Sequence, residues 1–388
     1  MTERGDDGVM DRRGFLKTAG AGLTAAGAVG VSADRVVAQS LSEKHRLDRI
    51  ATNSWALRQL FKSRPGGGRG RGTAPGGTAA PAAGGGGTGR AGTGGQTAAQ
   101  MKQKYGEITM MDFPQFTKDT FPGVTHLDIR SSLMGDVTDD SMYVRGLFDP
   151  SSASGRKWLE GFDKRLAATG TKVHHISNNA PTNLADPDAT LRQAGVDIGK
   201  KWLDGAAILG VRSVRMNSPS AFGASIRPSA VSDPATGYPK NDALMPLLNN
   251  AIDSYKEMAD YGGNLGIRVT IENHWGLAAD PVNIRIILDA VNHPYCEATP
   301  DFCNWEYEHM LFSGLKVLAP YAHTHCHAKY WDRWTTNDVQ RSVRIMLATG
   351  YKGMFALEYE DGPWDAVEGS KYLFKEVTTA LSTPAPVI

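Results

Sequence analysis

The feature that most constrains how this chain can fold is a repeated alternation of short β-rich runs with helical segments. Eight runs are strand candidates: Arg49–Ser54, Thr125–Arg130, Lys172–Ser177, Ser213–Asn217, Arg268–Glu272, Ala298–Phe302, Ala322–His327 and Met354–Glu358. Strands that alternate with helices favour a parallel sheet, and eight of them close most economically into a (β/α)8 TIM barrel. An open doubly wound sheet is the alternative, but no glycine-rich phosphate fingerprint follows the first candidate. The sequence therefore predicts an α/β protein with a TIM barrel.

Several helical segments between these runs have recognisable ends. Asp280 and Pro281 supply an N-cap and a first-turn proline before apolar residues at helical spacing. Another helix follows Asn337, and Gly350 is the residue type that ends helices in the left-handed conformation. These ends fall between strand candidates, as a barrel requires.

The N-terminal segment is typical of an export signal rather than of a folded domain. The run Asp11–Lys17 reads DRRGFLK, and an Ala/Gly-rich apolar stretch, Thr18–Val31, follows it. That stretch is too short and too rich in glycine to span a membrane. Small residues in Val36–Ala38 match a cleavage site. We therefore expect residues 1–38 to be a twin-arginine signal peptide that engages the twin-arginine translocase, and the mature protein to be periplasmic or extracellular without a stable membrane anchor.

The remaining residues, 39–388, are predicted to form one TIM-barrel domain with an insertion at about 64–99. Within it, Pro65–Gly95 is almost entirely Gly, Ala, Thr, Pro and Arg. Such a segment buries too little apolar surface to offset its ordering entropy, so we expect it to be disordered.

Charge and cysteine content argue against two classes of protein. The formal net charge of +1 gives no electrostatic case for a nucleic-acid partner. Cys296, Cys303 and Cys326 are too few for a disulfide framework in 388 residues, and we expect them to be small buried side chains. The sequence leaves a homo-oligomer open.

A histidine-rich run lies at the centre of the functional prediction. In Tyr321–Arg333, His323, His325 and His327 alternate with other residues, so in a strand all three would point to one face. His327 is the one best placed to reach the rim of a barrel, and a deeper histidine could hydrogen-bond a ligand.

Three carboxylates occupy the corresponding positions of neighbouring strand candidates. Glu272, Asp301, His327 and Glu358 follow one another at intervals of 26 to 31 residues, close to the length of one βαβ unit. Each stands at the C-terminal end of its strand candidate, where TIM-barrel enzymes carry their chemistry. Three carboxylates and one imidazole suit one divalent ion, Mn²⁺, Mg²⁺ or Co²⁺, with Zn²⁺ as a further option. The alternative is that the carboxylates pair with barrel-lining cations such as Arg268 or Arg215.

The motifs around these four residues resemble the sugar isomerase/epimerase family with a xylose-isomerase-like barrel. The matching segments are IENH around Glu272, PDFCN around Asp301, HAK from His327 and LEYE around Glu358. The resemblance implies that Glu272, Asp301, His327 and Glu358 hold the metal and that Glu272 and Glu358 also move the substrate proton. It further implies a substrate-binding role for Arg333.

The chain departs from that family at two positions expected to contact substrate. Asn304 replaces a histidine three residues after the metal aspartate, and Ala278 replaces a glutamate six residues after the first metal glutamate. His274, Asn304, Lys329 and Trp55 lie near other rim positions and are further candidates for substrate binding.

These features favour a metal-dependent isomerase or epimerase of a free sugar or keto-sugar. A metal-stabilised enediolate would form, with the two glutamates as acid and base. The same enolate chemistry would also suit a lyase or dehydratase that acts by β-elimination on a keto-glycoside. A non-catalytic carbohydrate-binding barrel is a third hypothesis. A nuclease of the related apurinic-endonuclease type would need a fuller set of ligands than we find.

Overall fold

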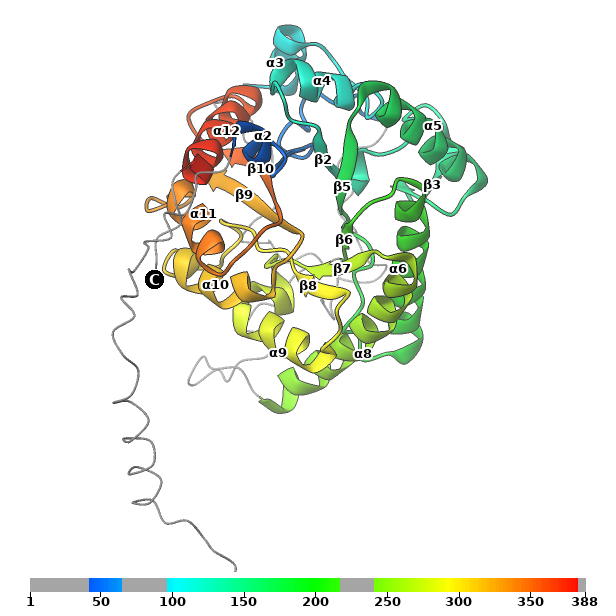
Figure 1. The fold of residues 1–388 in the computed structure, drawn as a ribbon. Coiled ribbons are helices and arrows are strands. Elements are labelled where there is room, and N and C mark those ends of the chain that lie inside the picture. Colours follow the sequence, from blue (N-terminus) through cyan, green and yellow to red (C-terminus); the bar gives the residue numbers. More distant parts are fainter. Residues whose placement is uncertain (1–41, 65–95, 217–240, 383–388) are drawn as a thin grey trace, which may run out of the picture. The chain divides into compact units, whose positions relative to one another are not determined.

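The computed structural model describes residues 42–64, 96–216 and 241–382 (Figure 1). The expected signal peptide, most of the expected insertion and Asn217 lie outside these ranges. Helix α3 (Ala98–Tyr105) begins within the segment predicted as an insertion, where Thr97 and Gln100 form a capping box. No helix in the described ranges is long and apolar enough to cross a membrane.

Eight parallel strands form the sheet predicted from the sequence, in the order β8-β7-β6-β5-β2-β1-β10-β9. Their bounds are β1 Ile50–Asn53, β2 His126–Arg130, β5 Lys172–Ser177, β6 Ser213–Arg215, β7 Arg268–Ile271, β8 Cys296–Ala298, β9 His325–Trp331 and β10 Met354–Asp361. A parallel bridge between Asp301 and His327 joins the segment after β8 to β9 and closes the ring. The backbone N–H of His327 donates to Pro300 O at 2.9 Å at this closure. The TIM barrel is therefore confirmed, and the open sheet is excluded.

Helices surround the strands, as Figure 1 shows. They are α2 Glu43–Leu47, α3 Ala98–Tyr105, α4 Phe113–Thr120, α5 Ala153–Thr169, α6 Ala189–Ile208, α8 Asn241–Leu265, α9 Pro281–Val291, α10 Met310–Leu318, α11 Val339–Ala348 and α12 Ala366–Ser382. A short hairpin, β3 (Tyr143–Val144) and β4 (Leu147–Phe148), precedes α5. Asp280 caps α9 as predicted, and Gly350 after α11 has a φ of +81°.

Alternation along the strands separates an apolar outer layer from a polar interior. In β2, Leu127 and Ile129 are buried with the hydrophobic core, whereas Asp128 and Arg130 carry the opposite face. The register between β2 and β5 shifts after Leu127, so that Asp128 pairs with His175. This bulge turns His175 toward the interior of the barrel.

Two strand predictions differ in register from the structure. Strand β8 ends at Ala298 instead of beginning there, and β9 begins at His325 instead of Ala322. A 3-10 helix, Ala319–Tyr321, occupies the approach to β9, so the chain enters the sheet only after Thr324. His323 is consequently exposed and does not share the inward face of His325 and His327.

Candidate metal centre

The predicted ligands converge on one atom, Nδ1 of His327. This nitrogen lies 3.3 Å from Glu358 Oε2, 3.4 Å from Glu272 Oε1 and 3.7 Å from Asp301 Oδ2. All four side chains are buried, yet His327 Nδ1 has no hydrogen-bond partner. Ligand atoms of Glu272, Asp301 and His327 all lie within 4.8 Å of one another, and Glu358 approaches the same nitrogen of His327 from β10.

The four residues reach this point from different depths along their strands. Glu272 directly follows β7, and Asp301 follows β8 by three residues. His327 and Glu358 instead lie within β9 and β10, which continue to Trp331 and Asp361, so the prediction that each would stand at a strand end is wrong for these two. Strands in a barrel are tilted and staggered, so mid-strand residues come level with the ends of others.

The electrostatics at this point favour a cation. Although burial opposes a charged imidazole, Glu358, Glu272 and the hydrogen bond to Asp128 raise the pKa of His327 well above its ordinary value. The same carboxylates and imidazole nitrogen form a donor set that could hold a metal ion in place of that proton. Three hard oxygen ligands and one imidazole fit Mn²⁺, Mg²⁺ or Co²⁺.

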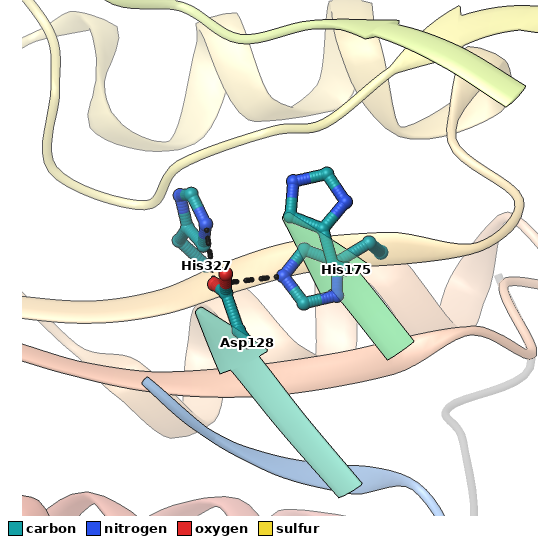
Figure 2. Close-up of side chains that lie close together, drawn as sticks. Asp128, His175 and His327 are labelled. Carbon is teal, nitrogen blue, oxygen red and sulfur yellow. Dashed lines mark hydrogen bonds and ion pairs between the residues drawn. The ribbon is translucent and has the colours of Figure 1, made fainter. Parts of the chain in front are cut away.

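Asp128 contacts the other ring nitrogen of His327, Nε2 (Figure 2). Asp128 Oδ2 lies 3.0 Å from His327 Nε2, and Asn53 Nδ2 donates to the same oxygen at 2.8 Å. Ser177 Oγ donates to Asp128 Oδ1 at 2.8 Å. Burial opposes the charge of Asp128, but hydrogen bonds from His325 and His327 keep its pKa well below the ordinary value. With Nε2 directed at Asp128, Nδ1 of His327 is the nitrogen that faces the other carboxylates.

Two further buried histidines, His175 and His325, lie next to Asp128 and His327. The rings of His175 and His325 stack with centroids 4.0 Å apart, and His325 Nε2 lies 3.2 Å from Asp128 Oδ2. Ligand atoms of Asp128, His175, His325 and His327 all lie within 4.8 Å of one another. Because four polar side chains already contact the two oxygens of Asp128, we interpret this group as support for His327. His325 therefore acts through Asp128 and does not contact a ligand carboxylate directly.

The four predicted ligands, Glu272, Asp301, His327 and Glu358, are called the quartet below. Two cations balance the charges of its glutamates. Arg215 forms an ion pair with Glu272, and Lys329 Nζ lies 3.0 Å from Glu358 Oε1. Burial raises the pKa of Glu272, but Arg215 and His327 overcome it and hold the pKa well below the ordinary value. Burial raises the pKa of Glu358 in spite of Lys329 and His327. Arg268, the other cation considered, pairs with Glu297 instead.

Asn304 contacts the ligands themselves. Asp301 Oδ1 accepts backbone N–H groups of Cys303 at 2.7 Å and of Asn304 at 2.9 Å, which folds this turn back onto the site. The side-chain amide of Asn304 then donates to Glu272 Oε1 at 2.8 Å and to Asp301 Oδ2 at 3.0 Å. Asn304 therefore orients two ligands. Ala278 lies buried in a 3-10 helix.

The other residues predicted to bind substrate occupy the rim in different ways. Lys329 reaches into the quartet, whereas His274 is half-buried beside Trp275, and burial lowers its pKa to about 4. Arg333 is exposed, with its guanidinium 4.3 Å from the Trp334 ring centroid and 5.5 Å from that of Trp275. In the described chain its contacts are with this aromatic group and Glu306 O, and none joins it to the quartet. The ring of Trp55 lies against the guanidinium groups of Arg58 and Arg130.

The supporting roles of Asp128 and Asn53 are not predicted from the sequence. Asp128 stands between Leu127 and Ile129 in β2, and this alternation of polar and apolar residues is the signal that places it inside a barrel, whereas all four residues of β1, Asn53 included, are buried. Their partner, however, is His327 or Glu358 from a strand some 200 to 300 residues away. No local pattern identifies such a partner.

Comparison with known proteins agrees with this architecture. The chain belongs to the family of xylose isomerase-like TIM barrels, whose pattern matches residues 142–376. Among solved structures it is similar to a 3-keto-D-glucoside 4-epimerase from E. coli in its apo form, with a TM-score of 0.51 and 14% identity over 69% of this chain and 94% of the other. It is also similar to an L-ribulose 3-epimerase, with a TM-score of 0.50 and 14% identity over 70% and 89% of the two chains. No curated protein matches the sequence.

Proposed function

We propose that this protein is a divalent-metal-dependent sugar isomerase or epimerase that acts on a free sugar or keto-sugar. The observation that carries the proposal is the convergence of three carboxylates on the unpartnered Nδ1 of His327. The family supports it, as do the names of the two similar structures, which describe epimerases of sugars. When bound, the metal would polarise the oxygens of a hydroxyketone and acidify the C–H between them, which favours an enediolate.

Glu272 and Glu358 are the acid and base in this proposal. They come from β7 and β10, which are not adjacent in the sheet, so they can flank a substrate from two directions. One carboxylate removes the proton on one face of the substrate, and the other returns a proton on the opposite face. Arg215 and Asn304 orient Glu272, while Lys329 and Asn53 orient Glu358.

Export is part of the proposal and rests on the sequence alone. The twin-arginine pathway carries folded proteins, so a metal could be bound before translocation. The substrate would then be an extracellular or periplasmic sugar, which favours a free sugar over a phosphorylated one.

Two measurements test the activity together. Elemental analysis of the purified mature protein should find about one divalent metal per chain, and Glu272→Gln and Glu358→Gln should reduce that content. Ketoses and keto-glycosides incubated in deuterated water should gain deuterium beside the carbonyl without bond cleavage. Glu297→Gln is the matched control, because Glu297 is equally buried but lies at the other end of the barrel.

The alternatives give different results. Release of a leaving group with the deuterium would identify a β-eliminating lyase. Sugar binding without exchange, unaffected by Glu358→Gln, would identify a binding protein. A well-folded protein that takes up no metal even on soaking would disprove the proposed chemistry.

A further inference from the structure

A cationic layer lies immediately above the metal quartet, toward the C-terminal end of the barrel. Arg130 follows Asp128 by two residues on β2, so the two side chains share the inward face and stand about 7 Å apart along the strand. On the adjacent β1, which ends at Asn53, Trp55 stands two residues further along, in the turn after the strand. The guanidinium of Arg130 packs 4.5 Å from the ring centroid of Trp55. Because Asp128 and Asn53 contact His327 and Glu358, Arg130 stands one layer nearer the rim than the quartet.

Arg130 differs from the other cations of this region in having no acceptor. Arg215 bonds Glu272, Lys329 bonds Glu358, and Arg58 NH2 lies 3.0 Å from Glu360 Oε1. In the described chain the guanidinium of Arg130 makes no hydrogen bond, its Nε is buried without a partner, and the residue keeps only 7% exposure. A buried charged donor without an acceptor is destabilising, so such a group is retained where a ligand completes it.

The charges of the region point to the sign of that ligand. The carboxylates are Asp128, Glu272, Asp301, Glu358 and Glu360, and the cations are Arg58, Arg130, Arg215 and Lys329. A divalent ion with neutral His327 would leave this group with an excess of one positive charge. The unpaired donors lie on Arg130, so one negative charge placed there restores neutrality.

We propose that Arg130 binds a carboxylate of the substrate, which is therefore a keto-sugar acid and not a neutral ketose. This inference rests on the proposed function. A guanidinium offers a flat fork of two N–H groups that matches a carboxylate bidentately. The ring of Trp55 fixes the plane of that fork by a cation–π contact before the ligand arrives. A phosphate dianion would exceed the charge available and would require more donors than this one group offers. The acid group at Arg130 would leave the carbonyl end of the sugar to the quartet below.

The test is binding of matched sugar pairs, measured by calorimetry on the metal-loaded protein. D-Fructuronate and D-tagaturonate are compared with D-fructose and D-tagatose, and ketose phosphates serve as a third group. The acids should bind about 10- to 100-fold more tightly than the neutral sugars. Arg130→Met, which keeps length and removes the charge, should abolish this preference, whereas Arg130→Lys should retain part of it. The control is Arg285→Met, because Arg285 is exposed on α9.

The outcomes separate this inference from the proposed function. Neutral sugars that bind as tightly as the acids and exchange deuterium would overturn the role of Arg130 and leave the epimerase intact. A preference for phosphates would also overturn it, as would an Arg130→Met variant that keeps the preference for acids. Acid binding that is lost in Arg130→Met, without deuterium exchange, would support the inference and contradict the epimerase. Thermal unfolding of each variant shows whether it is folded.

Discussion

Two glutamate–arginine pairs, each with a buried glutamate, occupy opposite ends of this barrel. Near the C-terminal end, Glu272 after β7 pairs with Arg215 of β6. At the N-terminal end, Glu297 of β8 pairs with Arg268 of β7, with 3.2 Å between Arg268 Nε and Glu297 Oε2. Each pair therefore joins neighbouring strands with the same residue types, and both glutamates are buried.

The two pairs differ in what surrounds the carboxylate. Glu297 Oε1 accepts the backbone N–H of Thr324 at 3.1 Å, which fixes the approach to β9 at the base of the barrel. Glu272 instead shares its space with Asp301, Glu358 and the unpartnered nitrogen of His327. Burial raises the pKa of Glu297 to about 7, whereas Arg215 holds that of Glu272 well below its ordinary value against the effect of burial.

The comparison shows that a buried glutamate with an arginine partner is not evidence of function in itself. The single carboxylate of Glu297, which accepts from local donors, joins two strands and requires no cation beyond its arginine partner. Several carboxylates around an imidazole nitrogen without a partner repel one another and favour a cation between them. The two ends can therefore be distinguished experimentally by substitutions that are chemically identical.

The largest expected difference between the ends is in catalysis. Glu358→Gln removes one of the two proposed acid–base groups and should lower kcat by about 10²–10⁴-fold. Glu297→Gln makes the same chemical change at the base and should leave kcat nearly unchanged. Initial rates of deuterium exchange into the substrate measure both variants. Equal losses in the two would show that the effect is on folding and not on the reaction.

A smaller effect is expected in metal binding when the support of His327 is changed. Asp128→Asn keeps the size of the side chain but removes the charge that accepts from His327 Nε2. Metal affinity should fall by about 10- to 100-fold, as measured by competition with a chelator. Ser213→Ala, which removes the hydroxyl at 2.8 Å from His175 Nδ1, is the control and should leave the affinity unchanged. An unchanged affinity in Asp128→Asn would mean that Asp128 serves only the core.

The quartet could be predicted from the sequence because parallel strands bring residues at regular intervals to one end of a barrel. Glu272, Asp301, His327 and Glu358 needed only their spacing and the family resemblance for this prediction. The structure brings all four together around His327 Nδ1. The barrel itself followed from the number of strand candidates, and the structure confirms it.

The support beneath the quartet could not be predicted in this way. His174 and His175 are consecutive in β5 and should face opposite sides of the sheet, so local sequence does not say which of them faces the interior. A register shift between β2 and β5 aligns His175 with Asp128. The shift depends on pairing between strands and not on local composition. The exposure of His323 is a similar case, because the contact of Glu297 with Thr324 delays the start of β9.

Glu297, at the base of the barrel, should make the stability of the protein depend on pH. Glu297 has a pKa of about 7 in the folded protein, above its ordinary value of 4.5, so the folded state holds its proton more tightly than the unfolded state. The free energy of unfolding should therefore fall as the pH rises from about 4.5 to 7, by about 2–3 kcal/mol. Urea unfolding of the protein and of Glu297→Gln measures the difference between them. The same pH dependence in both would assign it to other groups.

The smallest expected effect is at the rim, where Arg333 contacts three tryptophans. Its guanidinium lies 4.3, 5.2 and 5.5 Å from the ring centroids of Trp334, Trp331 and Trp275. Exposed cation–π contacts contribute about 0.5–1 kcal/mol each. Because no contact joins Arg333 to the quartet in the described chain, Arg333→Ala should raise KM by about 2- to 5-fold and leave kcat unchanged.

Arg333→Lys is the matched variant, since it keeps the charge over the rings but loses the planar fork. A KM close to that of the unchanged protein would assign the effect to charge, and one equal to that of Arg333→Ala would assign it to the fork. A fall in kcat of a hundredfold in either variant would instead place Arg333 beside the reacting atoms. That result would mean that the rim closes onto the quartet when substrate binds, and that the contrast between the two ends of the barrel extends to the loop after β9.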